Sequence, residues 1–109
     1  MNPEDATLDE LRDALAPRIA ANAGFDGWGE AALLAAADEL GVDADVARLA
    51  FPGGALDMID GWFAHIDREM LERLPPHRLE AMKVRERIAA LVEARLEAAY
   101  DDREALRRL

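Results

Sequence analysis

The two histidines and the carboxylates near them are the first candidates for metal ligands in this chain. His65 and Glu69 are four positions apart, so a helix would place both side chains on one face, where they could share a metal ion. A di-iron helical bundle needs a Glu-x-x-His motif on each of two helices. Trp62 occupies the glutamate position before His65, and Leu74 occupies it before His77. We therefore interpret His65 and Glu69 as a local surface pair and expect neither a metal site nor a cofactor.

Gly53 and Gly54 stand before a predicted helix, as glycines do in phosphate-binding turns. Those turns follow a strand and continue into Lys-Ser or Lys-Thr, and this sequence has neither feature. A helix entry that needs permissive backbone angles explains the two glycines better. The chain has no serine and no cysteine, and its one threonine is Thr7, so no nucleophile stands beside a base. We predict that the chain is not an enzyme.

The composition favours helices over strands. The chain has 109 residues, enough for one domain with a small core, and 51% of them are hydrophobic. Alanine and leucine supply most of this fraction, whereas aromatic residues make up 6% and β-branched residues are scarce. The absence of cysteine excludes disulfides and thiolate zinc sites. We predict an all-α chain.

The first predicted helix has a clear start and an interrupted middle. Asp5 or Thr7 can cap it, and apolar residues follow at spacings of three and four. Pro17 lies inside this pattern, removes a backbone donor and crowds the preceding turn, so we expect a kink or a break there. Gly24 is predicted to end the helix.

Two shorter helices follow, and their layout resembles a helix-turn-helix. The alanine-rich segment 28–40 ends at Gly41, and Asp43 caps the segment 44–50. The charges of this unit are wrong for DNA, because the stretch 26–51 has six acidic side chains and a single basic one, Arg48. The chain has a net charge of −10, and a DNA-binding surface must neutralise phosphates with Lys and Arg. We predict no nucleic-acid partner.

Two longer helices are predicted in the second half. The fourth covers residues 55–74 and stops at Pro75-Pro76, and the fifth covers residues 77–100. Residues 101–109 either extend the fifth helix or begin another. The apolar stripe of the fourth helix comprises Leu56, Ile59, Phe63, Ile66, Met70 and Leu74, with Met58 and Trp62 beside it. The stripe of the fifth helix comprises Leu79, Met82, Ile88, Leu91, Val92, Leu96 and Ala99.

These elements predict a helix-turn-helix-like part at residues 1–54 and a second part of long helices at residues 55–109. Three short helices cannot cover both long ones, so we expect exposed apolar surface, or a homo-oligomer that covers it. The sequence ends without a helix stop signal, and we expect the remainder of the second domain to be missing. The candidates for lipid-facing or interface positions are Trp62, Ile66, Ile88, Leu91, Val92 and Leu96.

The location predicted from the sequence is the cytoplasm. The N-terminus is acidic and shows no apolar signal-peptide core. No run of about 18 apolar residues occurs, so we expect no membrane span. Peripheral contact with an inner membrane is compatible with this pattern.

Two turns carry a resemblance to a known family. Phe25-Asp26-Gly27-Trp28 precedes the alanine-rich helix, and Phe51-Pro52-Gly53-Gly54 follows the third helix. Together with the later run Met82-Lys83-Val84-Arg85-Glu86-Arg87-Ile88, they resemble ubiquinone-biosynthesis accessory proteins of the Coq-nine type over roughly residues 8–100. Gly27, Trp28, Phe51, Pro52 and Gly53 are the turn residues that identify this resemblance.

The resemblance implies a TetR-like fold, in which a helix-turn-helix part precedes a helical ligand domain. It implies a lipid-binding accessory protein, often a dimer at the membrane surface, that presents a lipid precursor to a di-iron hydroxylase. The lipid, an isoprenoid or a phospholipid, would bind mainly in the C-terminal half that this sequence lacks. Two alternatives stay open: a TetR-like DNA-binding regulator, and a self-associating helical interaction module.

Overall fold

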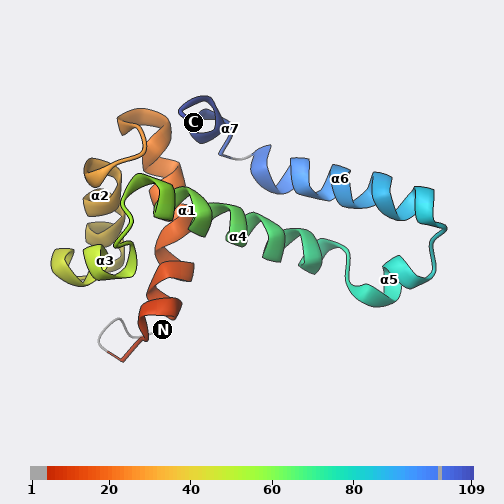
Figure 1. Cartoon of the computed structure of the whole chain (residues 1–109), viewed down its shortest axis with the longest axis horizontal. Helices are drawn as coiled ribbons and strands as arrows, with labels where there is room; N and C mark the ends of the chain where they lie inside the picture. Colours follow the sequence, from red (N-terminus) through yellow and green to blue (C-terminus); the bar gives the residue numbers. More distant parts are fainter. Residues whose placement is uncertain (1–4, 101) are drawn as a thin grey trace.

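A computed structural model describes residues 5–100 and 102–109, and all regular elements in these residues are helices (Figure 1). The predicted all-α class is confirmed. Helix α1 lies at the centre, with α2, α3, α4 and α7 packed against it, while α6 runs back along α4. The helices are α1 (Leu8–Asp26), α2 (Glu30–Leu40), α3 (Ala44–Ala50), α4 (Ala55–Arg73), α5 (Pro76–Glu80), α6 (Val84–Tyr100) and α7 (Arg103–Arg107).

Helix α1 begins with a capping box and is longer than predicted. The hydroxyl of Thr7 accepts the backbone N–H of Glu10 at 3.1 Å, and the Glu10 carboxylate accepts the N–H of Thr7 at 3.4 Å. The helix passes Gly24 and ends at Asp26, where Gly27 adopts a positive φ of 79°. Glycine suits that position because a side chain would be strained there.

Of the kink or break expected at Pro17, the break is wrong, because α1 continues through the proline as one helix. Pro17 leaves the carbonyl of Asp13 without its helical donor, and Asp13 is exposed, so water can supply the missing bond. Leu15 and Ile19, on either side of the proline, are fully buried. Burial on both sides holds the helix together at a site where the local preference is to interrupt it.

Two short helices, α2 and α3, form at the predicted turns. Gly41 ends α2 in the left-handed conformation, and the carboxylate of Asp43 accepts the N–H of Asp45 at 2.9 Å to cap α3. Helix α2 begins at Glu30, two residues later than predicted. Trp28 lies before it and uses its indole N–H to bond the carbonyl of Ala105 at 3.0 Å.

Helix α4 forms over almost the predicted range, but its buried face is shifted from the predicted stripe. Met58, Trp62 and Ile66, spaced by four, are buried, whereas Leu56 at the start of the predicted stripe is 76% exposed. Trp62 has no exposed surface and packs against Trp28 with ring centroids 5.4 Å apart. Met58 and Trp62, which were predicted to lie beside the apolar stripe, therefore lie at the centre of the buried face of α4.

The predicted fifth helix is divided into α5 and α6, so the continuous helix at 77–100 is a wrong prediction. The Glu86 carboxylate accepts the N–H of Lys83 at 3.4 Å, which gives α6 its own N-terminus. Arg87 donates to the carbonyl of Met82 at 3.0 Å and ties the connection to α6. These local bonds compete with helix continuation between α5 and α6.

The tail begins a new helix, α7, which packs on α1. Ala105 of α7 is buried, and a Cβ atom at Gly24 would lie only 2.9 Å from the Cβ of Glu104. The absence of a side chain at Gly24 thus permits the close approach of α7. The buried cluster includes residues from both sides of residue 54, and the division into two parts there stays a prediction.

Arg12 joins three helices at one point. Its guanidinium donates to the carbonyl of Ala50 at 3.2 Å and to the carbonyl and carboxylate of Asp57 at 3.0 and 3.1 Å. It also lies 5.0 Å from the ring centre of Phe51. The hydrogen bond from Arg12, assisted by the backbone N–H of Gly53, lowers the pKa of Asp57 below its usual value. The ends of α3 and α4 are thereby fixed on α1.

We predict that Asp57→Asn lowers the free energy of unfolding by about 1–2 kcal/mol at pH 7. Because the pKa of Asp57 is lowered in the folded state, its stabilisation is present above the unfolded pKa of about 3.9 and is lost as the pH falls through the lower folded value. Denaturant titrations from pH 7 to acid should therefore show the two proteins converging. A difference that stays constant down to acid pH would contradict this role.

Gly61 lets α4 approach α1 closely. A Cβ atom at Gly61 would lie 3.1 Å from Phe51 and 3.5 Å from the Cβ of Ala16, and both neighbours are buried. Phe51 is held by Arg12, so it has little freedom to move away. We predict that Gly61→Val lowers the free energy of unfolding by about 1–3 kcal/mol, measured by urea titration. Ala64→Val, at an exposed position of α4, should cost only about 0.5 kcal/mol, and equal costs would contradict the close packing.

Candidate functional site

The basic residue of the helix-turn-helix-like segment is already paired. Arg48 on α3 donates from Nε to the Glu30 carboxylate at 2.6 Å and from Nη1 to the Asp45 carboxylate at 2.8 Å. The hydrogen bond to Glu30 is the main cause that raises the pKa of Arg48 above its usual value. A phosphate would have to compete with two carboxylates for this guanidinium. The geometry therefore gives α3 no free cation with which to hold DNA.

The His65–Glu69 pair forms as the spacing predicts, with 3.3 Å between His65 Nε2 and the Glu69 carboxylate. Arg73 also lies 3.8 Å from the Glu69 carboxylate. Within residues 5–100 and 102–109, no group of three or more metal-ligating side chains gathers that could hold a metal ion. The pair is thus part of a network of surface charges on α4.

The Gly53–Gly54 turn serves the entry to α4. Gly54 has φ 70° and ψ −138°, a backbone conformation that is essentially restricted to glycine. The N–H of Gly53 is bonded to the Asp57 carboxylate at 2.9 Å, and a Cβ atom at Gly53 would lie 3.2 Å from that side chain. Of the other turn residues that carry the resemblance, Gly27 ends α1, Phe51 is buried and Pro52 is exposed.

The six candidate lipid or interface residues fall into two environments. Trp62 and Ile66 are buried in the core, so they lie away from the surface. The indole N–H of Trp62 is buried without a hydrogen-bond partner among the described residues. Ile88, Val92 and Leu96 are exposed on α6, and Leu91 is half-buried. Helix α6 instead buries Ala94, Ala98 and Ala99.

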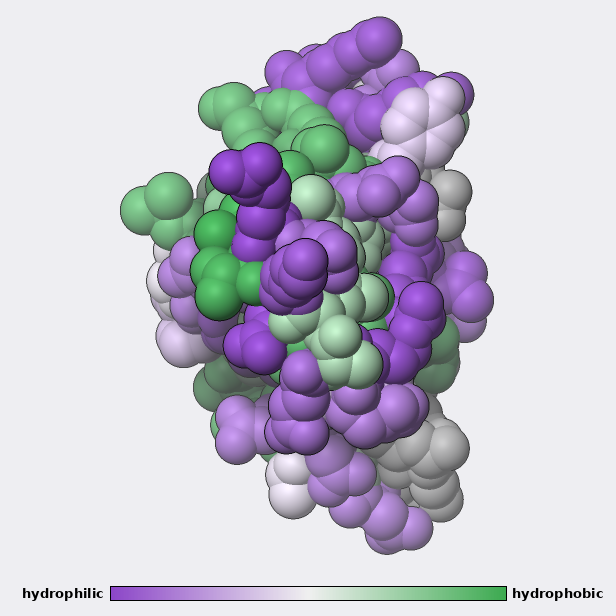
Figure 2. Space-filling view, turned by 90° about the vertical axis from the view of Figure 1, so that its right-hand side faces the viewer, coloured by the Kyte–Doolittle hydropathy of each residue, from purple (hydrophilic) through white to green (hydrophobic). Residues whose placement is uncertain are grey.

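The exposed apolar residues of α6 form a continuous row. Val84, Ile88, Val92, Leu96 and Tyr100, which we name the α6 ridge, follow one another at intervals of four and are 54–68% exposed. On a helix this spacing produces a ridge that winds slowly around the axis. Figure 2, a view of the right-hand side of Figure 1, shows hydrophobic residues gathered at the surface in its upper left part, among hydrophilic ones. The expected exposed apolar surface is therefore present on α6.

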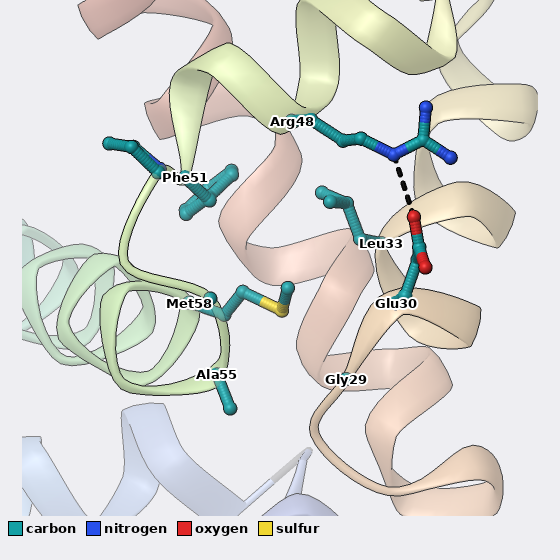
Figure 3. Close-up of a pocket in the computed structure, with 9 residues that line it drawn as sticks. Gly29, Glu30, Leu33, Arg48, Phe51, Ala55 and Met58 are labelled. Carbon is teal, nitrogen blue, oxygen red and sulfur yellow. Dashed lines mark hydrogen bonds and ion pairs between the residues drawn. The ribbon is translucent and has the colours of Figure 1, made fainter.

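A pocket of about 280 Å³ lies between α2, α3 and the start of α4 (Figure 3). Its apolar walls include Leu33, Phe51 and Met58, which are each 3% exposed. In Figure 3 the side chains of Leu33 and Met58 extend towards one another from α2 and α4, and the Glu30–Arg48 pair lies at one side. Two glycine N-caps, Gly29 of α2 and Gly54 of α4, also line it.

Sequence reasoning missed the residues that organise this region. Arg12 and Arg48 are basic residues in an acidic half of the chain, and this contrast was an available signal for a specific partner. Met58 was placed beside the apolar stripe of its helix, although its spacing of four from Trp62 indicates a shared face. No pattern in the sequence predicted that the residues around the pocket come together from three helices.

Comparison of the chain with protein-family models, with curated proteins and with solved structures gives no match. Among the residues that the structure describes, no helix is both long and apolar enough to cross a membrane.

We predict that the chain does not retard a DNA duplex in a gel-shift experiment at low salt, where attraction to phosphate is strongest. The reason is the pairing of Arg48 with Glu30 and Asp45, together with the net charge of −10. A basic DNA-binding domain run on the same gel provides the positive control. Retardation that weakens as salt is raised would favour the regulator alternative.

Proposed function

We propose that this chain is a non-enzymatic accessory protein of ubiquinone biosynthesis that binds lipid and presents a lipid precursor to a di-iron hydroxylase. The class of protein and the hydroxylase partner come from the resemblance of the two turns. The observation that carries the lipid-binding part is the α6 ridge, with five apolar side chains that are each more than half exposed. A TetR-like arrangement of the helices belongs to the same proposal.

The energetics of the α6 ridge support an apolar ligand. Full burial of a valine, leucine or isoleucine side chain is worth about 1.5–3 kcal/mol relative to water. In the folded chain, more than half of the surface of Ile88, Val92 and Leu96 is still exposed to water. Covering these side chains with a partner would therefore stabilise the complex by several kcal/mol. Exposed apolar surface of this kind typically marks a site of interaction. A hydrocarbon chain lying along the ridge satisfies that requirement without needing any directed hydrogen bond.

The rest of the chain fits an accessory role. Helix α3 occupies the place of a DNA-reading helix, but Asp43 and Asp45 stand at its start and Arg48 is paired. The helix-turn-helix-like part then serves as a scaffold that holds α4, and α4 in turn supports α6. The same features disfavour a DNA-binding regulator.

A self-associating module is the second candidate function, because the residues of the α6 ridge are spaced by four. Rows of this spacing from two helices interdigitate when the axes cross at about −50°. A homodimer formed in this way would cover the same side chains as a lipid. Light scattering over a range of concentrations distinguishes the two, since a monomer at all concentrations excludes the dimer.

We predict that Val92→Glu reduces the amount of lipid bound by the chain at least fivefold, because it places a carboxylate in the middle of the α6 ridge. The measurement is native mass spectrometry of the chain incubated with an isoprenoid lipid or with phospholipid, followed by extraction and quantification. Ala64→Glu adds the same charge at an exposed position of α4 and should leave binding unchanged. Absence of any bound lipid in the unchanged chain would contradict lipid binding by the α6 ridge.

A further inference from the structure

The basic side chains of the chain fall into two groups according to their partners. In residues 5–75 every basic side chain forms an ion pair with a carboxylate, and these side chains are Arg12, Arg18, Arg48, Arg68 and Arg73. Residues 76–87 have four basic and two acidic side chains, and among the described residues no carboxylate pairs with any of the four. The fold therefore leaves a group of unpaired positive charges around the connection between α5 and α6.

Two of these cations flank the first residue of the α6 ridge. Val84 is 68% exposed, and the exposed residues Lys83 and Arg85 stand directly before and after it. The backbone N–H of Lys83 is bonded to Glu86, but within the described part of the chain the side chains of Lys83 and Arg85 have no hydrogen-bond or ion-pair partner. The apolar ridge thus begins between two free cationic side chains.

The other two cations are held by backbone carbonyls. Arg87 donates to the carbonyls of Met82 at 3.0 Å and Glu80 at 3.5 Å, and Arg78 donates to the carbonyl of Arg73 at 3.2 Å. These bonds orient the guanidinium groups but do not neutralise their charge. A negatively charged partner at this end therefore has no ion pair to displace, in contrast to the situation at the helix α3.

The net charge of −10 on the chain acts mainly elsewhere. Helices α2 and α3, with their acidic turns, lie at the opposite end of the molecule from α5 and the start of α6 (Figure 1), and the longest axis measures 47 Å. Charges in water are screened over about 8 Å at physiological ionic strength. The charges around the start of α6 therefore determine what binds there.

The length of the α6 ridge suits one acyl chain. From Val84 to Leu96 it extends about 18 Å, at about 1.5 Å per residue. An acyl chain spans half of the roughly 30 Å hydrocarbon core of a bilayer. A free phosphate or a polynucleotide could use the cations but has no hydrocarbon to cover the ridge, whereas a neutral isoprenoid could cover the ridge but would leave the cations without a partner.

From this combination we infer that the lipid bound by the α6 ridge has an anionic phosphate headgroup. The headgroup lies at Lys83 and Arg85, and an acyl chain extends along Ile88, Val92 and Leu96. This inference rests on the proposed lipid binding and adds the chemical class of the headgroup. Lys83 and Arg85 are then the residues that determine specificity for the charge of the lipid.

The test compares two lipids that differ in headgroup charge. The full chain is labelled with ¹³C at its isoleucine δ1 methyls, and NMR follows Ile88 on the ridge, with the buried Ile19 and Ile66 as internal controls. The probes are dihexanoylphosphatidylglycerol, which is anionic, and dihexanoylphosphatidylcholine, which has the same acyl chains and no net charge, both below their micelle-forming concentrations. We expect both to shift Ile88 in a saturable way, and the anionic lipid to bind at least about threefold more tightly at low salt.

The outcomes separate this inference from the proposed function. Equal affinity for the two lipids, or a preference for the uncharged one, overturns the anionic headgroup but leaves lipid binding intact. No shift of Ile88 with either lipid overturns both. Glycerol 3-phosphate, which has the phosphate without acyl chains, should not shift Ile88 at the same concentrations. A shift as strong as that caused by the anionic lipid would identify a site for free phosphate and overturn the lipid.

A pair of matched variants tests the assigned residues. Lys83→Gln combined with Arg85→Gln should abolish the preference for the anionic lipid and leave the affinity for the uncharged lipid unchanged. Arg18→Gln combined with Arg68→Gln removes the same charge at exposed positions of α1 and α4 and should retain the preference. A preference that survives the first pair, or is lost in the second, overturns the assignment. The comparison of the two lipids on the unchanged chain decides the headgroup class even if a variant fails to fold.

Discussion

The contacts of Arg12 are the constraint on which the arrangement of the helices depends. The Arg12 guanidinium donates to the carbonyl of Ala50 at the end of α3. It also donates to the backbone carbonyl and the side-chain carboxylate of Asp57 in the first turn of α4. The last carbonyls of a helix have no intrahelical partner, and a charged donor that bonds one of them and also bonds the neighbouring helix fixes the relative position of the two helices. Phe51 lies under the same guanidinium and thereby becomes a fixed wall. The approach of α4 at Gly61 and the shape of the pocket beside Phe51 both follow from this one side chain.

Small residues determine which surface of α6 is buried. Helix α6 has an alanine face, which includes Ala94 and Ala98, and a face of larger apolar residues, the α6 ridge. Alanine permits close packing at almost no cost in side-chain entropy, whereas the larger residues would require a wider separation. The structure places the alanine face inward and leaves the larger residues in contact with water. Apolar surface on the α6 ridge is therefore still exposed, and the free energy that its burial would release is the physical basis of the proposed lipid binding.

Much of the fold could be predicted because local signals determine the ends of most helices. The turn at Gly41 and the cap at Asp43 appear where the sequence places them, and the all-α class follows from composition. The errors arise where tertiary contacts override local preference, as at Pro17, whose helix is held by burial on both sides. The choice between two apolar faces on α4 and on α6 was also beyond the sequence. Periodicity shows that a face is apolar, but it does not show which neighbour covers it.

The candidate site was less predictable than the fold for the same reason. Ile88, Val92 and Leu96 were selected for their spacing and are exposed, whereas Trp62 was selected as a large aromatic residue beside the stripe of its helix and is fully buried. The pocket depends on residues from three helices that no spacing rule connects, and Arg48 reaches it only because Glu30 starts the neighbouring helix. In a DNA-binding unit a basic residue at this place would be kept free for phosphate. Here Arg48 is paired with both Glu30 and Asp45, so the position offers no free positive charge to a phosphate.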